Sequence, residues 1–385
     1  MMPSSPIRSC TAHAAARQRG MTLIELMVAM VIALLLALAM VSALVFGEAQ
    51  RRTTSATSDM DQSGAYAASL LDTALRNAGS GLVQTPSLIG CNPGFTGALP
   101  IPFDKFLDGQ MANLRVAPVL IAANPSETMP ASDVLMVMSG SGAAGSIPRT
   151  VVSASGSMLT LSNTVGIIPD PSTIGRDKPQ VLIDQPGSSN CALLTVMGGS
   201  IDPPTLTLNQ SLTINPTQVL PLGNLGASDV QFQLFGVDPA TGTLSSYDLL
   251  AQKLQPLAGN VLAMQALYGI ADGSGRLTKW VAPTSADGYD ITTLLNTPSE
   301  FNQIVAIRVA LILKGNLLEK DAINTQNTLT WFKPASGNAD LAGIPFAADA
   351  MNQTWPLSGD AARYRYRVLE FVVPVRNSLL PNPNS

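Results

Sequence analysis

One uninterrupted apolar segment near the N-terminus constrains this chain more than any other feature. Residues 26–47 form a run of 22 positions without a charged residue or a proline. At about 1.5 Å per residue, a helix of this length spans the ~30 Å hydrocarbon core of a bilayer. A secretory signal has a shorter apolar region followed by a small-residue cleavage site. The segment therefore predicts a transmembrane helix, and an ordinary signal peptide fits poorly.

A carboxylate, Glu25, stands directly before this run. A carboxylate in a membrane span is costly unless a cation pairs with it. We therefore expect Glu25 to meet a cation. In the alternative interpretation, the segment is a simple signal anchor and Glu25 lies at the level of the lipid headgroups.

The residues around Glu25 read Gly20-Met21-Thr22-Leu23-Ile24-Glu25-Leu26. This motif resembles the class III signal of type IV pilins and type II secretion pseudopilins. The resemblance implies that a membrane-embedded prepilin peptidase cleaves between Gly20 and Met21, and that the new amino group of Met21 is methylated. It also implies an assembly role for Glu25, which would pair with the terminal ammonium of a neighbouring subunit.

The orientation of the span does not follow from charge alone. Three arginines precede the span and two follow it closely, so the positive-inside bias is slight. The pilin resemblance implies a cytoplasmic leader at residues 1–20. It also implies a single pass through the bacterial inner membrane and a periplasmic body.

The helix is expected to continue past the membrane as a stem. Apolar or small residues recur at three- and four-residue intervals, which indicates one buried stripe: Met60, Gly64, Ala67, Leu71, Ala74 or Leu75, and Ala78. Gly79 and Gly81 supply the left-handed conformations that end helices. The sequence thus predicts a leader at 1–20, a transmembrane and stem helix at 21–79, and a head at 80–385.

The head has the composition of an exported β-rich domain. Charged residues make up 12% of the chain, and short apolar runs alternate with turn residues. The expected strands cover residues 133–138, 149–153, 158–161, 181–183, 192–196, 205–214, 230–235, 261–270, 304–313 and 364–375. The predicted fold class is α+β: a type IV pilin-like helix packed on a large antiparallel β-rich domain.

The positions of the cysteines and the histidine restrict which reactions and metal sites the mature chain can support. Cys10 and the single histidine, His13, both lie in the leader, so the mature chain keeps only Cys91 and Cys191. Two thiols in an oxidising compartment predict one disulfide, with two buried free thiols as the alternative. Without histidine, a Ser-His-Asp or Cys-His nucleophile is excluded and the commonest metal ligand is missing. We expect no enzymatic activity, no cofactor and no metal site.

Charge argues against a general nucleic-acid surface. Removal of the leader leaves 19 of the 22 basic side chains against 26 acidic ones. Arginine and tyrosine alternate from residue 363 to residue 367. In a strand, this alternation predicts that Arg363, Arg365 and Arg367 share one face. That face is read as solvated, with an anion-binding stripe as the alternative.

Two further sequence patterns resemble ligand-binding motifs but lack the context that those motifs require. Residues 140–145 spell a dinucleotide fingerprint, but no helix opens at the third glycine, so a loop is favoured. Asp272, together with Asp287 and Asp290, suggests a calcium loop that lacks the ligand spacing and the bidentate Glu of an EF-hand. An ordinary turn is favoured there.

Three segments of the mature chain, 63–79, 302–313 and 364–377, resemble the PilW family of minor pilins. The resemblance implies a non-enzymatic minor pilin that joins a priming or tip complex. Its partners would be the prepilin peptidase, other minor pilins, the major pilin and the inner membrane. The alternatives are a minor pseudopilin of type II secretion, which neighbouring genes would distinguish, and a pilus-tip module for adhesion or DNA uptake. The latter is disfavoured by an aromatic content of 5%.

Overall fold

The computed structural model describes residues 21–82, 85–109, 111–123, 132–140, 147–168, 178–225, 229–324, 328–375 and 377. The chain divides into two compact units, residues 1–55 and 56–385. The boundary lies inside the first helix, so each unit is described by itself. The domain boundaries expected from the sequence stay predictions.

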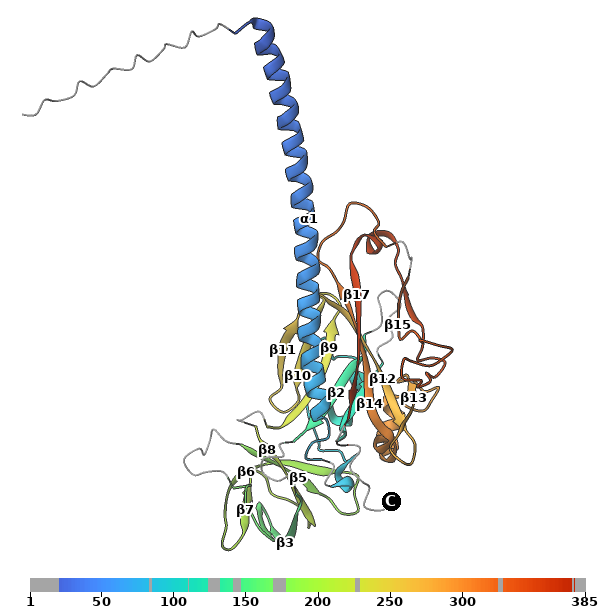
Figure 1. Cartoon of the computed structure of the whole chain (residues 1–385). Coiled ribbons are helices and arrows are strands. Elements are labelled where there is room, and N and C mark those ends of the chain that lie inside the picture. The colour runs from blue at the N-terminus through green and yellow to red at the C-terminus, as the bar shows by residue number, and fades with distance from the viewer. Residues whose placement is uncertain are drawn as a thin grey trace, which may run out of the picture. The chain divides into compact units, whose positions relative to one another are not determined.

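A single long helix, α1, runs from Leu23 to Asn77 (Figure 1). The hydroxyl oxygen of Thr22 accepts the backbone N–H of Glu25 at 3.3 Å, which satisfies one of the free amides of the first turn. At the other end, Gly79 and Gly81 adopt φ angles of 74° and 76°. These left-handed conformations end the helix within two residues of the predicted position.

Two antiparallel sheets form the body of the second unit (Figure 1). The five-stranded sheet has the order β1 (Val119–Ala122), β2 (Val134–Ser139), β9 (Gln231–Asp238), β10 (Thr243–Asp248) and β11 (Lys253–Ala258). The four-stranded sheet has the order β13 (Leu277–Val281), β12 (Val261–Ala271), β14 (Ile304–Lys314) and β17 (Tyr366–Pro374). A hairpin of β15 (Thr328–Trp331) and β16 (Gln353–Pro356) lies in the excursion between β14 and β17.

The remaining six strands close into a small barrel, drawn in green in Figure 1. Their order is β3 (Arg149–Ser155), β4 (Met158–Leu161), β7 (Thr205–Leu208), β6 (Cys191–Ser200), β5 (Pro179–Asp184) and β8 (Gln218–Asn224). The barrel has its own core, to which Leu159, Ile183, Val196 and Leu206 contribute. It is inserted between β2 and β9, which pair with each other directly and end on the partners Ser139 and Gln231.

Short helices complete the described chain. The α-helix α2 spans Ile291–Asn296. Short 3-10 helices cover Pro86–Leu88, Phe106–Gly109, Met111–Asn113, Pro298–Gln303 and Gly359–Arg363.

The central strand β14 explains why its sequence is almost wholly apolar. Its residues alternate between two cores: Ile307, Val309 and Leu311 face the core that includes α1, whereas Ala310 and Ile312 face a second core. The second core is built around Trp331, Phe332 and Phe346 of the excursion. A strand that is buried on both faces needs a continuous apolar run rather than an alternating one.

The predicted stem stripe is confirmed. Its members in the second unit are buried: Met60, Gly64, Ala67, Leu71, Ala74, Leu75 and Ala78. The α+β fold class is likewise confirmed, and each of the ten predicted strands overlaps an observed one.

Several strand boundaries differ from the prediction: β6, for example, continues to Ser200 instead of ending at 196, and two other differences have a visible structural reason. The strand expected at 205–214 ends at Leu208, because Asn209 donates its N–H to Thr195 and Leu212 donates to Gly156, outside the ladder. The strand expected at 364–375 begins at Tyr366, because residues 359–363 form a 3-10 helix.

Candidate assembly site

The first part of α1 carries an apolar surface without a cover. Large apolar side chains from Met21 to Phe46 are exposed, for example Leu23 at 76% and Phe46 at 73%. Among the described residues, α1 is the one helix that is long and apolar enough to cross a bilayer. Length and composition alone support this assignment, which a signal sequence would also satisfy. An apolar surface of this extent needs a membrane or other proteins around it.

Glu25 lies in the first turn of this helix. Its side chain is exposed, and it makes no ion pair within the part of the chain that the structure describes. The free amides of a helix N-terminus favour a negative charge nearby, so the position tolerates a carboxylate locally. Met21 is 63% exposed, whereas Gly20 lies outside the described residues. The roles of Gly20, Met21 and Glu25 stay predictions.

The end of the stem is fastened to the rest of the second unit by three hydrogen bonds. Gly79 donates its N–H to Met138 at 2.8 Å, and Ser80 accepts the N–H of Gly140 at 2.7 Å. The side-chain amide of Asn377 donates to the carbonyl of Ala78 at 2.8 Å. Strand β2 and the C-terminal segment therefore meet at the last turn of α1.

Higher up the stem, two contacts connect α1 to the four-stranded sheet. Asp61 forms an ion pair with Arg367 of β17, with 2.6 Å between Oδ2 and Nη1. Gly64 packs so closely on β14 that a Cβ at this position would overlap Cδ1 of Leu313. The three segments that resemble the PilW family are thus brought together in space.

The structure corrects the predicted arginine face. Only Arg367 lies in β17, because Arg363 ends a 3-10 helix and the carbonyl of Arg365 accepts the N–H of Gly315. Each arginine pairs with an acid of its own chain: Arg363 with Asp360 at 3.0 Å, Arg365 with Glu319 at 3.0 Å, and Arg367 with Asp61. These contacts leave little support for an anion-binding stripe.

Sequence reasoning missed a half-buried ionic cluster on the other face of this sheet. Arg308 of β14, 14% exposed in its side chain, pairs with Asp340 at 3.3 Å and Glu370 at 2.9 Å. Asp340 also accepts the indole N–H of Trp280 at 2.8 Å, and the guanidinium lies 5.0 Å from the ring centre of Phe346. A lone arginine in an otherwise apolar strand was the available signal.

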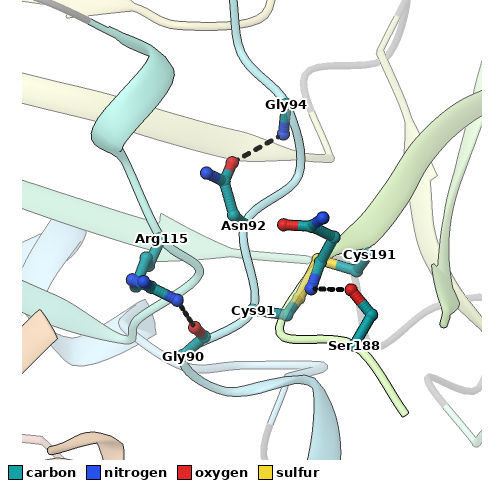
Figure 2. The surroundings of a disulfide bond; sticks show 8 residues. Gly90, Cys91, Asn92, Gly94, Arg115, Ser188 and Cys191 are labelled. Carbon is teal, nitrogen blue, oxygen red and sulfur yellow. Dashed lines mark hydrogen bonds between the residues drawn. A yellow bond between two sulfur atoms is a disulfide. The ribbon is translucent and has the colours of Figure 1, made fainter. Parts of the chain in front are cut away.

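The predicted disulfide is present in the structure. Cys91 and Cys191 are joined, with their Cα atoms 5.6 Å apart, and stand 100 positions apart in the sequence. Beside the bond, Asn92 donates its N–H to Ser189 and accepts the N–H of Cys191, both at 2.9 Å. Its side-chain oxygen accepts the N–H of Gly94 at 2.9 Å (Figure 2). The bond fastens the barrel strand β6 to the segment that follows the stem.

The aspartates considered for calcium serve separate local purposes. Asp272 forms the turn between β12 and β13, where one of its oxygens accepts the N–H groups of Ser274 and Arg276 and the hydroxyl of Ser274. These hydrogen bonds lower the pKa of Asp272. Asp287 pairs with Lys279 at 3.5 Å.

Asp290 caps α2. Burial acts to raise the pKa of Asp290, but hydrogen bonds from Thr292 and Thr293 outweigh it and lower the pKa. Within the described chain, no three potential ligand residues gather as a metal site. Of the dinucleotide-like sequence at 140–145, residues 141–145 lie outside the described residues.

Comparison with known proteins adds two matches. Residues 239–377 match the family model of the type IV pilus-assembly protein W, PilW. Residues 15–41 match the prokaryotic N-terminal methylation motif. No curated protein and no solved structure matches the chain.

The two matches agree with the geometry. The PilW match contains β12, β14 and β17, on which the stem packs through Gly64 and Asp61, and it ends at Asn377. The methylation motif spans the start of the exposed apolar helix, which together with the class III signal indicates membrane anchoring. The matched family is a structural component of assembly. The chain is therefore a PilW-like type IV pilin, a minor pilin of type IV pilus assembly.

Proposed function

We propose that this minor pilin acts in the priming or tip complex of the pilus and has no enzymatic role. The observation that carries the proposal is the exposed apolar surface from Met21 to Phe46, which contains Glu25, a carboxylate without an ion pair among the described residues. In a complex of pilins, neighbouring apolar helices cover such a surface. The terminal ammonium of an adjacent subunit supplies the cation that Glu25 lacks.

The size of the second unit favours a position in the pilus that only a few copies of the protein occupy. It spans residues 56–385 and includes an inserted barrel. A filament of many copies favours compact subunits, whereas a bulky head is accommodated more easily at an end. The partners in this proposal are other minor pilins and the major pilin.

Before assembly, the chain is a substrate of the prepilin peptidase. Cleavage after Gly20 and methylation of Met21 leave a single-pass protein in the bacterial inner membrane, with its body in the periplasm. A pseudopilin of type II secretion would share this route. The PilW match at residues 239–377 favours the pilus.

Intact-mass analysis of the protein purified from membranes tests this proposal. The expected mass is that of a chain that begins at methylated Met21 and contains one disulfide. Co-purification with other minor pilins should accompany it. A mature chain that begins at any other residue, or one that co-purifies only with secretion pseudopilins, would contradict the proposal.

A further inference from the structure

A polar pocket of about 490 Å³ lies where three segments of the second unit meet. The segment that follows the stem supplies Gly90 and Arg115, the loop between β5 and β6 supplies Ser188 and Asn190, and the end of α2 supplies Asn296. The volume falls within the range of roughly 300–1,000 Å³ that is usual for small-molecule sites.

The walls of this pocket are held in place by specific contacts. Gly90 has φ +84°, and a Cβ there would overlap the ring of Pro298, so the first and third segments touch. Arg115 donates from Nη1 to the carbonyl of Gly90 at 3.1 Å (Figure 2). The disulfide between Cys91 and Cys191 fastens the β5–β6 loop to the same segment.

The two charged side chains that line the pocket differ in how far they are available to a ligand. Its lining contains one acid, Asp184, and one base, Arg115. Asp184 already accepts the N–H groups of Thr217 and Gln218 at 2.8 and 2.7 Å and the hydroxyl of Thr217. Arg115 makes no ion pair within the described chain. The guanidinium of Arg115 therefore remains available to an anionic ligand, whereas the Asp184 carboxylate is already held by neutral donors.

Neutral polar side chains also line the pocket. The hydroxyl of Ser188 accepts the N–H of Asn190 at 3.1 Å and still has its own proton to donate. The side-chain amides of Asn190 and Asn296 have no hydrogen-bond partner among the described residues. A guanidinium beside amides and hydroxyls suits a ligand that carries both an oxyanion and hydroxyl groups.

We propose that this pocket binds an acidic saccharide, with Arg115 holding its carboxylate or phosphate group and the amides of Asn190 and Asn296 contacting its hydroxyls. The site is independent of the position of the protein in the pilus. It lies outside residues 239–377 apart from its third wall at 295–298, so it would be a property of this chain rather than of the matched segment.

Titration of the full mature chain in an uncharged detergent tests the proposal. The probes are glucuronate, glucose 6-phosphate and neutral glucose. At least one acidic sugar should bind with one-to-one stoichiometry at millimolar concentration, and glucose should bind at least about tenfold more weakly. Glucuronate alone would identify a carboxylate ligand, and glucose 6-phosphate alone a phosphate ligand. Equal binding of glucose, or binding of neither acidic sugar, would overturn the proposal.

Variants separate this site from general attraction to a cation. Arg115→Gln should weaken binding by about tenfold or more, whereas Arg276→Gln, on the exposed hairpin turn, should leave it unchanged. Arg115→Lys keeps the charge and should bind with intermediate affinity. The double variant Cys91→Ser with Cys191→Ser loosens one wall and should also bind more weakly. Urea unfolding of each variant shows that it is folded; a folded Arg115→Gln protein with unchanged affinity would refute the site.

Discussion

Asn377 donates a hydrogen bond from its side-chain amide to the carbonyl of Ala78 at 2.8 Å, although the two residues stand 299 positions apart. The last carbonyls of a helix have no partner within the helix. Ala78 directly follows α1, so the last residue of the PilW match satisfies a carbonyl at the end of the stem helix.

We expect Asn377→Ala to lower the free energy of unfolding by about 1 kcal/mol, because it leaves the carbonyl of the buried residue Ala78 unsatisfied. Asn377→Asp should be more destabilising, since it places a negative charge at the negative end of the helix dipole. Urea unfolding followed by circular dichroism measures both. If Asp were tolerated as well as Ala, the contact would not act as a helix cap.

The close approach of Gly64 to β14 gives a second prediction. Gly64→Ala should destabilise the protein, because an added methyl group must displace Leu313, which is only 1% exposed. Overpacking costs roughly 1–3 kcal/mol and exceeds the gain of up to about 1 kcal/mol in helix propensity. Gly47→Ala is the matched control, since nothing lies within 4 Å of its Cβ position. Equal thermal stability of the two variants would show that Leu313 moves aside freely.

How far the sequence predicts this fold depends on the kind of signal. The first part of α1, β12 and β14 are long runs of apolar residues, and the stem shows a periodic apolar stripe, so the positions of all four could be read directly. The strands β8, β11 and β16 contain Pro221, Pro256 and Pro356, which disfavour a strand assignment. The strand β10, with the sequence TLSSYD, has too few apolar residues to be recognised.

Long-range arrangement was harder to predict than individual elements. Most strands of the barrel were found separately, but nothing local shows that β3 pairs with β8, across about 70 residues, to close it. The disulfide could be predicted because two thiols permit only one pairing. The pocket around Arg115 could not, because its three walls come from distant parts of the chain.

The cluster around Arg308 yields a third prediction. Arg308→Met should lower the free energy of unfolding by about 3–5 kcal/mol, because Asp340 and Glu370 would be left as unpaired acids with little solvent exposure. The triple variant Arg308→Met, Asp340→Asn, Glu370→Gln removes the charges together and should recover part of the loss. Arg363→Ala is the control and should cost about 0–1 kcal/mol, because its partner Asp360 is 78% exposed. A mild effect of Arg308→Met alone would contradict the structural role of this cluster.

We predict that the barrel can be removed, because it is inserted between two strands that pair directly with each other. Joining Ser139 to Gln231 through an Asn-Gly turn, with Cys91→Ser, keeps the pairing of β2 with β9 in register. The variant should be less stable, because the barrel also contributes Leu182, Leu220 and Leu222 to the main core. It should nevertheless be processed and should co-purify with other minor pilins. Processed, folded protein that no longer co-purifies would place an assembly contact on the barrel.

The last prediction concerns Glu25, which is exposed beside an apolar run and has no cation within the described chain. Glu25→Ala should spare cleavage after Gly20, because the peptidase motif before it and the length of the span are unchanged. Assembly should fail, because an adjacent Met21 ammonium would lose its partner in a medium that penalises unpaired charge. Glu25→Gln is the matched control for shape and should fail in the same way. Mass analysis of the membrane fraction, counts of surface pili and co-purification with other minor pilins measure the two steps separately. Assembly at the level of the parent protein would show that Glu25 is tolerated near the headgroups and is not an assembly contact.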